Sequence, residues 1–360
     1  MTQSPSYVPI LKTKQGEFEA LERLTKMDRG NVLPLVDVVR VPPDWKKDGS
    51  SKELGEHLKG KARRVGRVWG DRLAFIDLYD IDLSLRVKSG KHPVTFMFEA
   101  LREQGCRAVP TTGFERDADY NEAVASVVAQ ESRGFCVRAL EEDLLDAVVL
   151  GDEIQRLART VGASLDQTHL ILDLRSIAGR DVRRYLPFLR SVLAGLPAIQ
   201  DLASVTLAAS SMPQHLGALI KTGQAATIER VEWALWRALC AEGGLPRLPS
   251  FGDYGVVHPD YLDLDPRKIT VAPNIRYTTR SGWLVLRGVS LRKRGFEQYH
   301  ELARRLVEHP EFLSAGDSWG DRYIVENAKR SERPGNLSKW VGVGTNHHLT
   351  VVGREVARLS

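Results

Sequence analysis

Cysteine is scarce in this sequence of 360 residues, which has Cys106, Cys136 and Cys240 and no CxxC pair. Three widely spaced thiols support neither a disulfide framework nor a structural zinc ribbon. Cys106 and Cys136 stand beside segments that we predict to be strands, so we expect buried, unreactive thiols at both positions. The sequence identifies no metal and no cofactor, and both are left as unknown.

Long apolar runs are also missing. No segment approaches the ~18 consecutive apolar residues that a membrane helix needs. The first residues, 1–20, lack the basic start, the apolar stretch and the cleavage site of a signal peptide. We therefore expect a cytoplasmic protein that makes no membrane contact.

Sequence motifs of the common phosphate-binding and hydrolytic sites are absent as well. No GxGxxG follows the first strand-like run, and no GxxxxGK[ST], GxSxG or HExxH occurs. These absences weaken nucleotide-binding folds of the doubly wound type and argue against a nucleophile elbow or a helical zinc site.

Charge is nearly balanced, with 51 basic and 46 acidic residues and a net charge of +5. Basic residues gather in two segments, Leu58–Arg72 and Arg287–Gly295. Each segment is typical of a solvated face, and each is also compatible with contact to nucleic acid or phosphate.

Strand-like apolar runs alternate with amphipathic, helix-like segments over the first 255 residues. Such alternation predicts βαβ crossovers and parallel strands. About eight units over this length favour a closed α/β barrel of the (β/α)8 or TIM-barrel type, with an open doubly wound sheet as the alternative. The predicted strands lie within residues 7–12, 31–39, 73–80, 106–112, 134–140, 168–174, 203–210 and 248–255.

The rhythm changes after Gly255. Residues 274–288 predict a β-hairpin that turns at Arg280-Ser281-Gly282, and residues 296–312 predict an amphipathic helix. That helix fits the last outer helix of the barrel, displaced by an insertion. We therefore divide the chain into a barrel-like domain, 1–255, and a segment, 256–360, that holds the insertion, the last outer helix and a closing segment packed on the same domain.

The closing segment begins with the sequence Gly344-Thr345-Asn346-His347-His348. We predict a turn here that opens a terminal helix capped by Thr345 or Asn346. Consecutive helical residues point about 100° apart, so we expect at most one of the two histidines to face inward, where it could reach the barrel mouth.

Segments along nearly the whole chain resemble a known family. The opening YVPILKTKQGEFEALERL and VLPLVDV, the hairpin pieces IRYT and GWLVLRG, and the later GDSWGDRYI and GTNHHLT are similar to the phage "beta protein" family. That family is named for a product of satellite phages, and its genes are associated with a companion killing function and with defence against other phages. The resemblance implies a role in phage conflict, in a toxin–antitoxin-like cassette, and supplies no catalytic residues.

Polar residues stand at the ends of most predicted strands. The active sites of such barrels lie at the C-terminal ends of the strands, so we expect these residues to meet at one mouth. As catalytic candidates we take Lys12, Asp77, Arg138 and Asp173. As ligand-binding candidates we take Lys14, Asp37, Arg175, Ser210, Asp253, Tyr254, Arg276, His347 and His348.

These residues allow more than one interpretation. Asp77 and Asp173 each end an apolar strand, where a charge is costly to bury unless it is paired. They can serve chemistry, hold a hard metal ion through oxygen ligands, or cap the next helix. Arg138 can bind an anion, or it can pair with one of these carboxylates in a buried network.

Three functions are compatible with the sequence. The first is an anti-phage defence protein that works with a companion protein. The second is a TIM-barrel enzyme, a hydrolase or a phosphodiesterase or nuclease, that acts on a phosphorylated or nucleotide substrate at the mouth. The third is nucleic-acid binding through the two basic segments. The sequence alone leaves open whether the protein is an enzyme.

Overall fold

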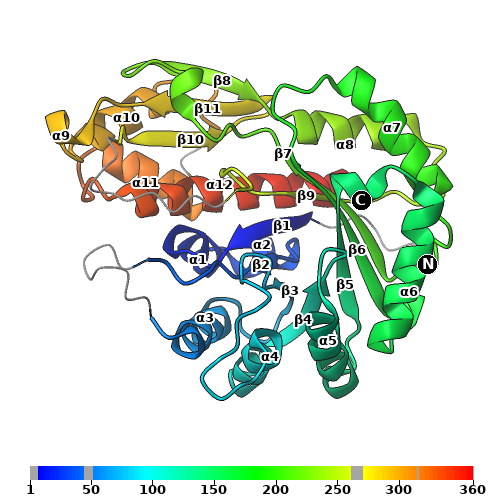
Figure 1. Cartoon of the computed structure of the whole chain (residues 1–360). Coiled ribbons are helices and arrows are strands. Elements are labelled where there is room, and N and C mark those ends of the chain that lie inside the picture. Colours follow the sequence, from blue (N-terminus) through cyan, green and yellow to red (C-terminus); the bar gives the residue numbers. More distant parts are fainter. Residues whose placement is uncertain (1–6, 44–51, 261–270, 314–315, 360) are drawn as a thin grey trace.

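Parallel strands form a closed barrel in the order β1-β2-β3-β4-β5-β6-β7-β9 (Figure 1). The computed structural model describes residues 7–43, 52–260, 271–313 and 316–359. β9 pairs with both β7 and β1, so the barrel is closed, the predicted fold is confirmed, and the open sheet is excluded. The barrel strands are β1 (Tyr7–Lys12), β2 (Leu35–Asp37), β3 (Leu73–Asp77), β4 (Arg107–Thr112), β5 (Phe135–Leu140), β6 (Thr168–Ser176), β7 (Ser204–Ser210) and β9 (Ser250–Asp253).

Helices connect successive strands and cover the outside of the barrel (Figure 1). Their starts follow ordinary capping chemistry: the Asp117 carboxylate accepts a hydrogen bond from the Tyr120 N–H, and Glu53 caps two N–H groups. Their apolar faces and the outward faces of the strands form the largest core. These helices are α1 (Gln15–Glu22), α2 (Lys26–Gly30), α3 (Leu54–Trp69), α4 (Pro93–Glu103), α5 (Ala118–Glu131), α6 (Ala147–Val161), α7 (Val182–Gly195) and α8 (Val231–Glu242).

A second, antiparallel sheet lies beside the barrel in the order β10-β11-β8 (Figure 1). β10 (Asn274–Thr278) and β11 (Gly282–Arg287) form the predicted hairpin. β8 (Ala225–Glu229) comes from the β7–β9 connection and was not apparent in the sequence pattern. This sheet packs with α10 (Gln298–Val307) and α11 (Trp319–Ala328) around a separate apolar cluster, while α9 (Leu291–Arg294) is a short exposed turn.

The last helix corrects two expectations. α12 runs from Leu337 to Leu359, so Thr345 and Asn346 lie inside it and cap nothing. It packs against α1, α2 and β1, and it occupies the place of the eighth outer helix that we had assigned to residues 296–312. The glycines of this segment suggested a turn, but in the helix they allow neighbouring backbone to pack closely. A Cβ on Gly344 would lie 2.6 Å from the backbone oxygen of Arg276, and one on Gly342 would lie 2.9 Å from that of Gly16.

The interior of the barrel holds its own apolar layer. Ile10, Phe75, Val109 and Ile171 belong to a small cluster enclosed by the strands, together with Cys136. Cys136 and Cys106 are buried free thiols, as predicted, and burial raises the pKa of the Cys106 thiol to about 11. Above this layer, toward the C-terminal ends of the strands, the inward side chains change from apolar to polar.

The helices offer no candidate for a membrane span. Over the part of the chain that the structure describes, none is both long and apolar enough to cross a bilayer.

We expect the close approach at Gly344 to be essential for docking α12. Gly344→Ala should lower the free energy of unfolding by about 1 to 3 kcal/mol, because the new methyl group must displace backbone. Gly60→Ala is the matched control: Gly60 also lies inside a helix but has no atom within 4 Å of its Cβ position, so helix propensity should keep or raise stability. Urea unfolding of both variants tests this, and equal stabilities would contradict the packing role.

Candidate functional site at the barrel mouth

A ring of polar side chains closes the C-terminal end of the barrel interior. Side chains on a strand alternate between the two faces, so the residues two positions after Ile10, Phe75 and Cys136 also face inward. The inward layer formed in this way consists of Lys12, Asp37, Asp77, Thr111, Arg138, Asp173, Ser210 and Tyr254, and all eight are buried. The strands thus bring seven of the predicted site residues to one mouth.

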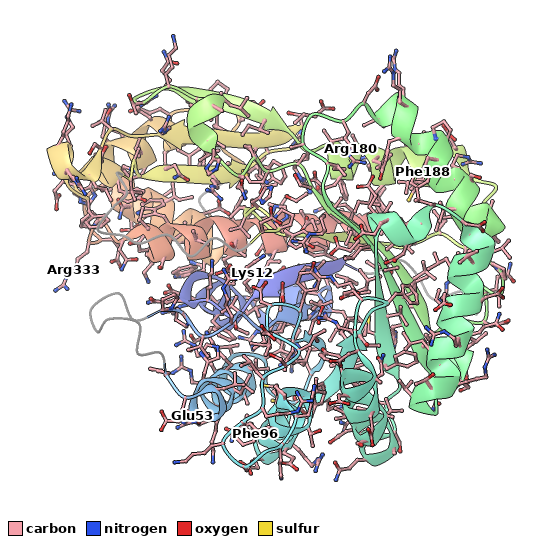
Figure 2. All side chains as sticks on the ribbon, in the orientation of Figure 1. Lys12, Glu53, Phe96, Arg180, Phe188 and Arg333 are labelled. Carbon is pink, nitrogen blue, oxygen red and sulfur yellow. The ribbon has the colours of Figure 1, made fainter. Side chains whose placement is uncertain are left out.

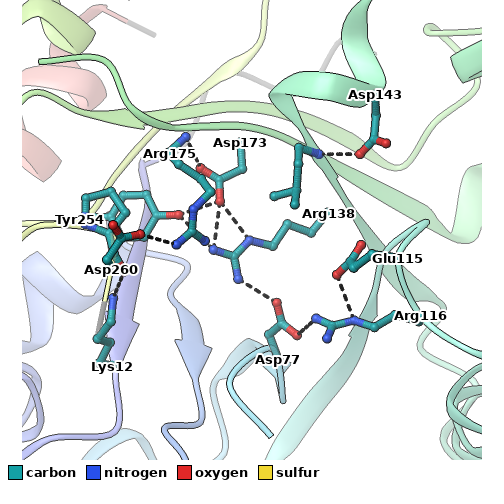
Figure 3. Close-up of polar contacts among 12 residues, drawn as sticks. Lys12, Asp77, Glu115, Arg116, Arg138, Asp143, Asp173, Arg175, Tyr254 and Asp260 are labelled. Atoms are coloured by element: carbon teal, nitrogen blue, oxygen red, sulfur yellow. Dashed lines mark hydrogen bonds and ion pairs between the residues drawn. The ribbon is translucent and has the colours of Figure 1, made fainter. Parts of the chain in front are cut away.

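Arg138 is the centre of this layer (Figure 3). Its Nε donates to Asp173 Oδ2 at 2.9 Å, its Nη1 to Asp77 Oδ2 at 2.7 Å and its Nη2 to the Tyr254 hydroxyl at 2.8 Å. The hydroxyl of Tyr254 in turn donates to Asp173 Oδ2 at 2.5 Å. Burial alone would lower the pKa of Arg138, but Tyr254, Asp173 and Asp77 outweigh it and raise that pKa. The contacts favour the pairing interpretation of Arg138 over anion binding.

Two further residues of the network were missed by sequence reasoning. Arg116 lies in the loop after β4, and its Nη2 donates to Asp77 Oδ1 at 2.9 Å, so Asp77 stands between two arginines. The ring of Tyr79 lies 4.8 to 5.1 Å from the guanidinium carbons of Arg138, Arg116 and Arg175. Both residues follow the end of a strand by a few positions. That position is the one feature of the sequence from which they could have been predicted as site residues.

Lys12 and Asp37 lie on neighbouring strands in the same layer. They are register partners on β1 and β2, and Asp37 is also the partner of Asp77 on β3. Among the described residues, Oδ1 of Asp37 has no hydrogen-bond partner although it is buried. Burial raises the pKa of Asp37 to about 6 against the opposing charges of Arg138 and Lys12. Burial also lowers the pKa of Lys12, against the opposing charges of Asp37 and Glu17. Asp37 is therefore the group of this layer that can exchange a proton with a ligand near neutral pH.

Lys12 reaches toward the chain segment that follows β9. Its Nζ donates to the carbonyl oxygen of Pro259 and lies 5.3 Å from the centre of the Tyr254 ring. Figure 2 shows Lys12 near the middle of the molecule, whereas Glu53 and Phe96 lie toward its edge. The only amine of the inward layer is therefore held at the mouth by a neutral carbonyl group.

The structure places several predicted ligand-binding residues away from the mouth. Lys14 directly precedes α1 and is not part of the inward layer. Asp253 points outward from β9, and Arg276 donates from β10 to the Val256 carbonyl and to Asn274. The expectation that Asp253 and Arg276 meet the others at the mouth is wrong, because alternation turns Asp253 outward and the hairpin carries Arg276 into the second sheet.

Both histidines of α12 are fully buried, which corrects the expectation that at most one faces inward. His348 Nε2 lies 2.7 Å from Asp253 Oδ2, and Asp253 also accepts from the hydroxyl of Tyr7 at 2.8 Å. His347 Nδ1 lies 2.9 Å from Asp321 Oδ1, and its ring stacks on Tyr277. A helix with barrel on one side and sheet on the other can bury two neighbouring positions, so these residues join α12 to both layers and lie outside the mouth.

A buried cluster between β7 and α8 was also missed. The Ser211 hydroxyl and backbone N–H both contact Glu232 Oε2, at 2.5 and 3.0 Å. Burial raises the pKa of Glu232 to about 7, and Arg230 opposes this. The guanidinium carbon of Arg230 lies 5.1 Å from the centre of the Trp233 ring and 6.0 Å from that of the Trp283 ring. This cluster lies outside the inward layer of the mouth and stabilises the start of α8.

The site offers acid–base and anion chemistry more readily than metal chemistry. Within the described residues, no group of three or more His, Cys, Asp or Glu side chains is placed to hold a metal ion. Asp77 and Asp173, the carboxylates that could have been ligands, already accept hydrogen bonds from arginines.

The pair at Lys12 and Asp37 predicts a pH dependence of stability. The folded-state pKa of Asp37, about 6, exceeds the ordinary value of 3.8, so the folded state holds the extra proton between these values. The contribution of Asp37 to the free energy of unfolding therefore falls as pH rises from about 4 to 6. We expect Asp37→Asn to remove this loss. The free energy of unfolding of the variant should therefore rise relative to that of the native chain between pH 4 and 6, and the difference between the two should stay constant above pH 6. Urea unfolding between pH 4 and 8 measures this, with Asp152→Asn on the exposed face of α6 as control; parallel pH curves for native chain and Asp37→Asn would contradict it.

Comparison with known proteins places the chain in a family. The model of the Beta protein family matches residues 7–354. The chain is 23% identical to "Protein beta" of Enterobacteria phage P4 over 362 residues, which cover 96% of this chain and 92% of that one.

Solved structures show likeness only at a low level. A type I 3-dehydroquinate dehydratase from Clostridium difficile is 11% identical, with 72% of this chain and 88% of that chain covered and a TM-score of 0.40. The endoglucanase Cel6 from Mycobacterium tuberculosis is 13% identical, with 47% and 61% covered and a TM-score of 0.30. At these scores neither structure bears on function. By its sequence, the chain belongs to the Beta protein family.

Proposed function

We propose that this protein acts in anti-phage defence and does so through acid–base chemistry on a phosphorylated small molecule bound at the barrel mouth. The observation that carries the chemical part is the buried pair of Lys12 and Asp37, with one carboxylate oxygen left without a partner among the described residues. Membership in the Beta protein family supports the setting in phage conflict.

Asp37 suits the role of general base. A carboxyl group with a pKa of about 6 is largely ionised at pH 7, yet it holds a proton far better than an exposed aspartate does. In a hydrolysis, Asp37 takes a proton from water as the water oxygen bonds to phosphorus and the phosphorus–oxygen ester bond breaks. Lys12 stabilises the negative charge that develops on the phosphoryl and leaving oxygens.

Arg138 serves as a positioning residue in this proposal. Its Nε, Nη1 and Nη2 atoms donate to Asp173, Asp77 and Tyr254. The pairing holds the carboxylates of Asp77 and Asp173 in place, while Asp37, Glu17 and Asp80 oppose the lowering of the Lys12 pKa by burial. Removing Arg138 would leave two buried carboxylates short of a cation, at a cost of about 3 to 5 kcal/mol.

We expect Lys12→Met and Asp37→Asn each to abolish protection of a host challenged with phage, because Asp37→Asn removes the base that takes the proton from water and Lys12→Met removes the cation that stabilises the developing negative charge. Protection is measured as the reduction in plaque number in cells that carry the gene with its native neighbours. The matched controls are Lys88→Met and Asp82→Asn, which change exposed residues of the same types.

Thermal unfolding of the purified variants establishes that they are folded. If folded Lys12→Met and Asp37→Asn protect as well as the native chain, the acid–base proposal is wrong. If both lose protection while their exposed counterparts retain it, the chemistry at the mouth is required for defence.

Action with a companion protein is the second part of the proposal. An apolar patch supports it, formed by Leu145, Val148 and Val149 at the start of α6. Leu145 is 80% exposed and the two valines 57% each, which is unusual for large apolar side chains so close together. Nucleic-acid binding has less support, since Lys61 and Arg64 of the first basic segment contact the Thr13 carbonyl and the Phe18 ring.

We expect the double substitution Leu145→Ser and Val149→Ser to weaken co-purification with the product of a neighbouring gene at least tenfold, without loss of thermal stability. Met27→Ser is the matched control, because Met27 is 67% exposed and comes from α2. Undiminished co-purification of the double variant would remove this patch as the partner surface.

A further inference from the structure

The chain segment after β9 folds over the mouth and places a carboxylate there (Figure 3). Lys12 donates to the carbonyl of Pro259, and the Ser210 hydroxyl donates to the carbonyl of Val257 at 3.4 Å. Arg175 Nη2 donates to Asp260 Oδ1 at 2.7 Å. Three strands of the barrel, β1, β6 and β7, thus contribute contacts to one short segment.

Donors from separate segments converge on the Asp260 carboxylate. Arg175 binds Oδ1, and Gln214 Nε2, from the connection after β7, donates to Oδ2 at 3.4 Å. His258 Nδ1 accepts the Asp260 backbone N–H at 3.1 Å, which fixes the turn that presents this carboxylate. Burial acts to raise the pKa of Asp260, but Arg175, His258 and Lys12 together lower it.

The backbone at Arg175 is specialised for this position. Arg175 has φ of +51°, in the left-handed region that residues other than glycine rarely adopt. It lies where the register of β6 and β7 shifts between Asp173 and Ser176, as in a β-bulge. The Asp173 carboxylate accepts the Arg175 N–H at 2.9 Å and holds this conformation, which aims the guanidinium over Tyr79. Strained backbone of this kind is common where a side chain must be directed at a ligand.

We propose that Arg175, Gln214 and Lys12 form the phosphoryl-binding subsite of the mouth, and that the carboxylate of Asp260 occupies it until a ligand replaces it. The inference rests on the proposed function and names the regulation of that site. A carboxylate offers two oxygens, which Arg175 and Gln214 take. A phosphoryl group offers a third oxygen and a second negative charge, which match the ammonium of Lys12 on the adjoining carbonyl of Pro259.

Replacement of the Asp260 carboxylate by a ligand also explains how the ammonium group of Lys12 becomes available. Lys12 is held by Pro259, the residue beside Asp260, so displacement of the Asp260 carboxylate draws this carbonyl away from Lys12. The released ammonium then faces the ligand and Asp37. The internal occupant thereby keeps the acid–base pair inactive in the absence of ligand, and it lowers apparent affinity by the fraction of time that it fills the subsite.

Isothermal titration of the purified full-length chain with inorganic phosphate tests the subsite. Asp260→Ala should bind phosphate about tenfold more tightly than the native chain, as expected if the occupant fills the subsite about nine-tenths of the time. Adding Arg175→Met to Asp260→Ala should remove this gain. Acetate should bind Asp260→Ala at least tenfold more weakly than phosphate.

The ion pair between Arg180 and Glu141 provides the matched controls, because it is a comparable, partly exposed arginine–carboxylate pair beside α7. Glu141→Ala and Arg180→Met should leave phosphate binding unchanged. Equal affinity of Asp260→Ala and the native chain, a gain that persists with Arg175→Met, or equal binding of acetate would each overturn the proposal.

The titration is independent of any reaction. A gain in Asp260→Ala together with full protection by Asp37→Asn would keep the subsite and remove the acid–base function. If Asp37→Asn loses protection but Asp260→Ala binds phosphate no more tightly than the native chain, the acid–base function is kept and the subsite is removed.

Discussion

The buried guanidinium of Arg138 is the interaction on which the rest of the mouth depends. Asp77 and Asp173 each lie two positions after an apolar inward residue, Phe75 or Ile171, and neither carboxylate is reached by solvent. Two ionised carboxylates at the same end of a barrel repel each other strongly unless a cation lies between them. The planar guanidinium of Arg138 satisfies both at once, which a lysine could not do with the same geometry. Arg116 supplies a second cation to Asp77, so two arginines balance the two carboxylates within the network. Lys12 and Asp37 remain outside this balance.

Sequence reasoning predicted the barrel and most of this layer for a physical reason. A charged residue that ends an apolar strand, such as Asp77 or Asp173, must be paired or near water, and parallel strands bring such ends together. Arg116 and Tyr79 could not be predicted in the same way, since loop residues carry no periodicity that fixes their direction. Asp253 shows the limit even within a strand: one position separates it from Tyr254, and a single step along a strand moves a side chain to the opposite face.

The C-terminal helix was misread because its evidence is not local. Gly-Thr-Asn before an apolar stretch is typical of a turn and a helix start, and nothing nearby in the sequence contradicts that interpretation. Within α12, however, Asn346 accepts from the Gly320 N–H and donates to the Ala20 carbonyl, so its amide joins distant segments. The adjacent histidines follow the same logic, with carboxylate partners on β9 and α11. Polar residues that look like a cap or a metal site can therefore serve to lock a helix between two layers.

The mouth and the apolar patch are joined by β5 and the turn that follows it, which connects the two parts of the proposed function. β5 carries Arg138 inward and then continues into η1 (Glu141–Leu144), directly before Leu145. Glu141 of that turn accepts hydrogen bonds from Arg180 and from the hydroxyl of Tyr185, which hold the turn before the patch in place. A companion protein bound at Leu145 would stand at the edge of the same face that a ligand must enter. Ligand entry and partner binding would then influence each other by position alone, because the strand that carries Arg138 leads directly into the turn before the patch.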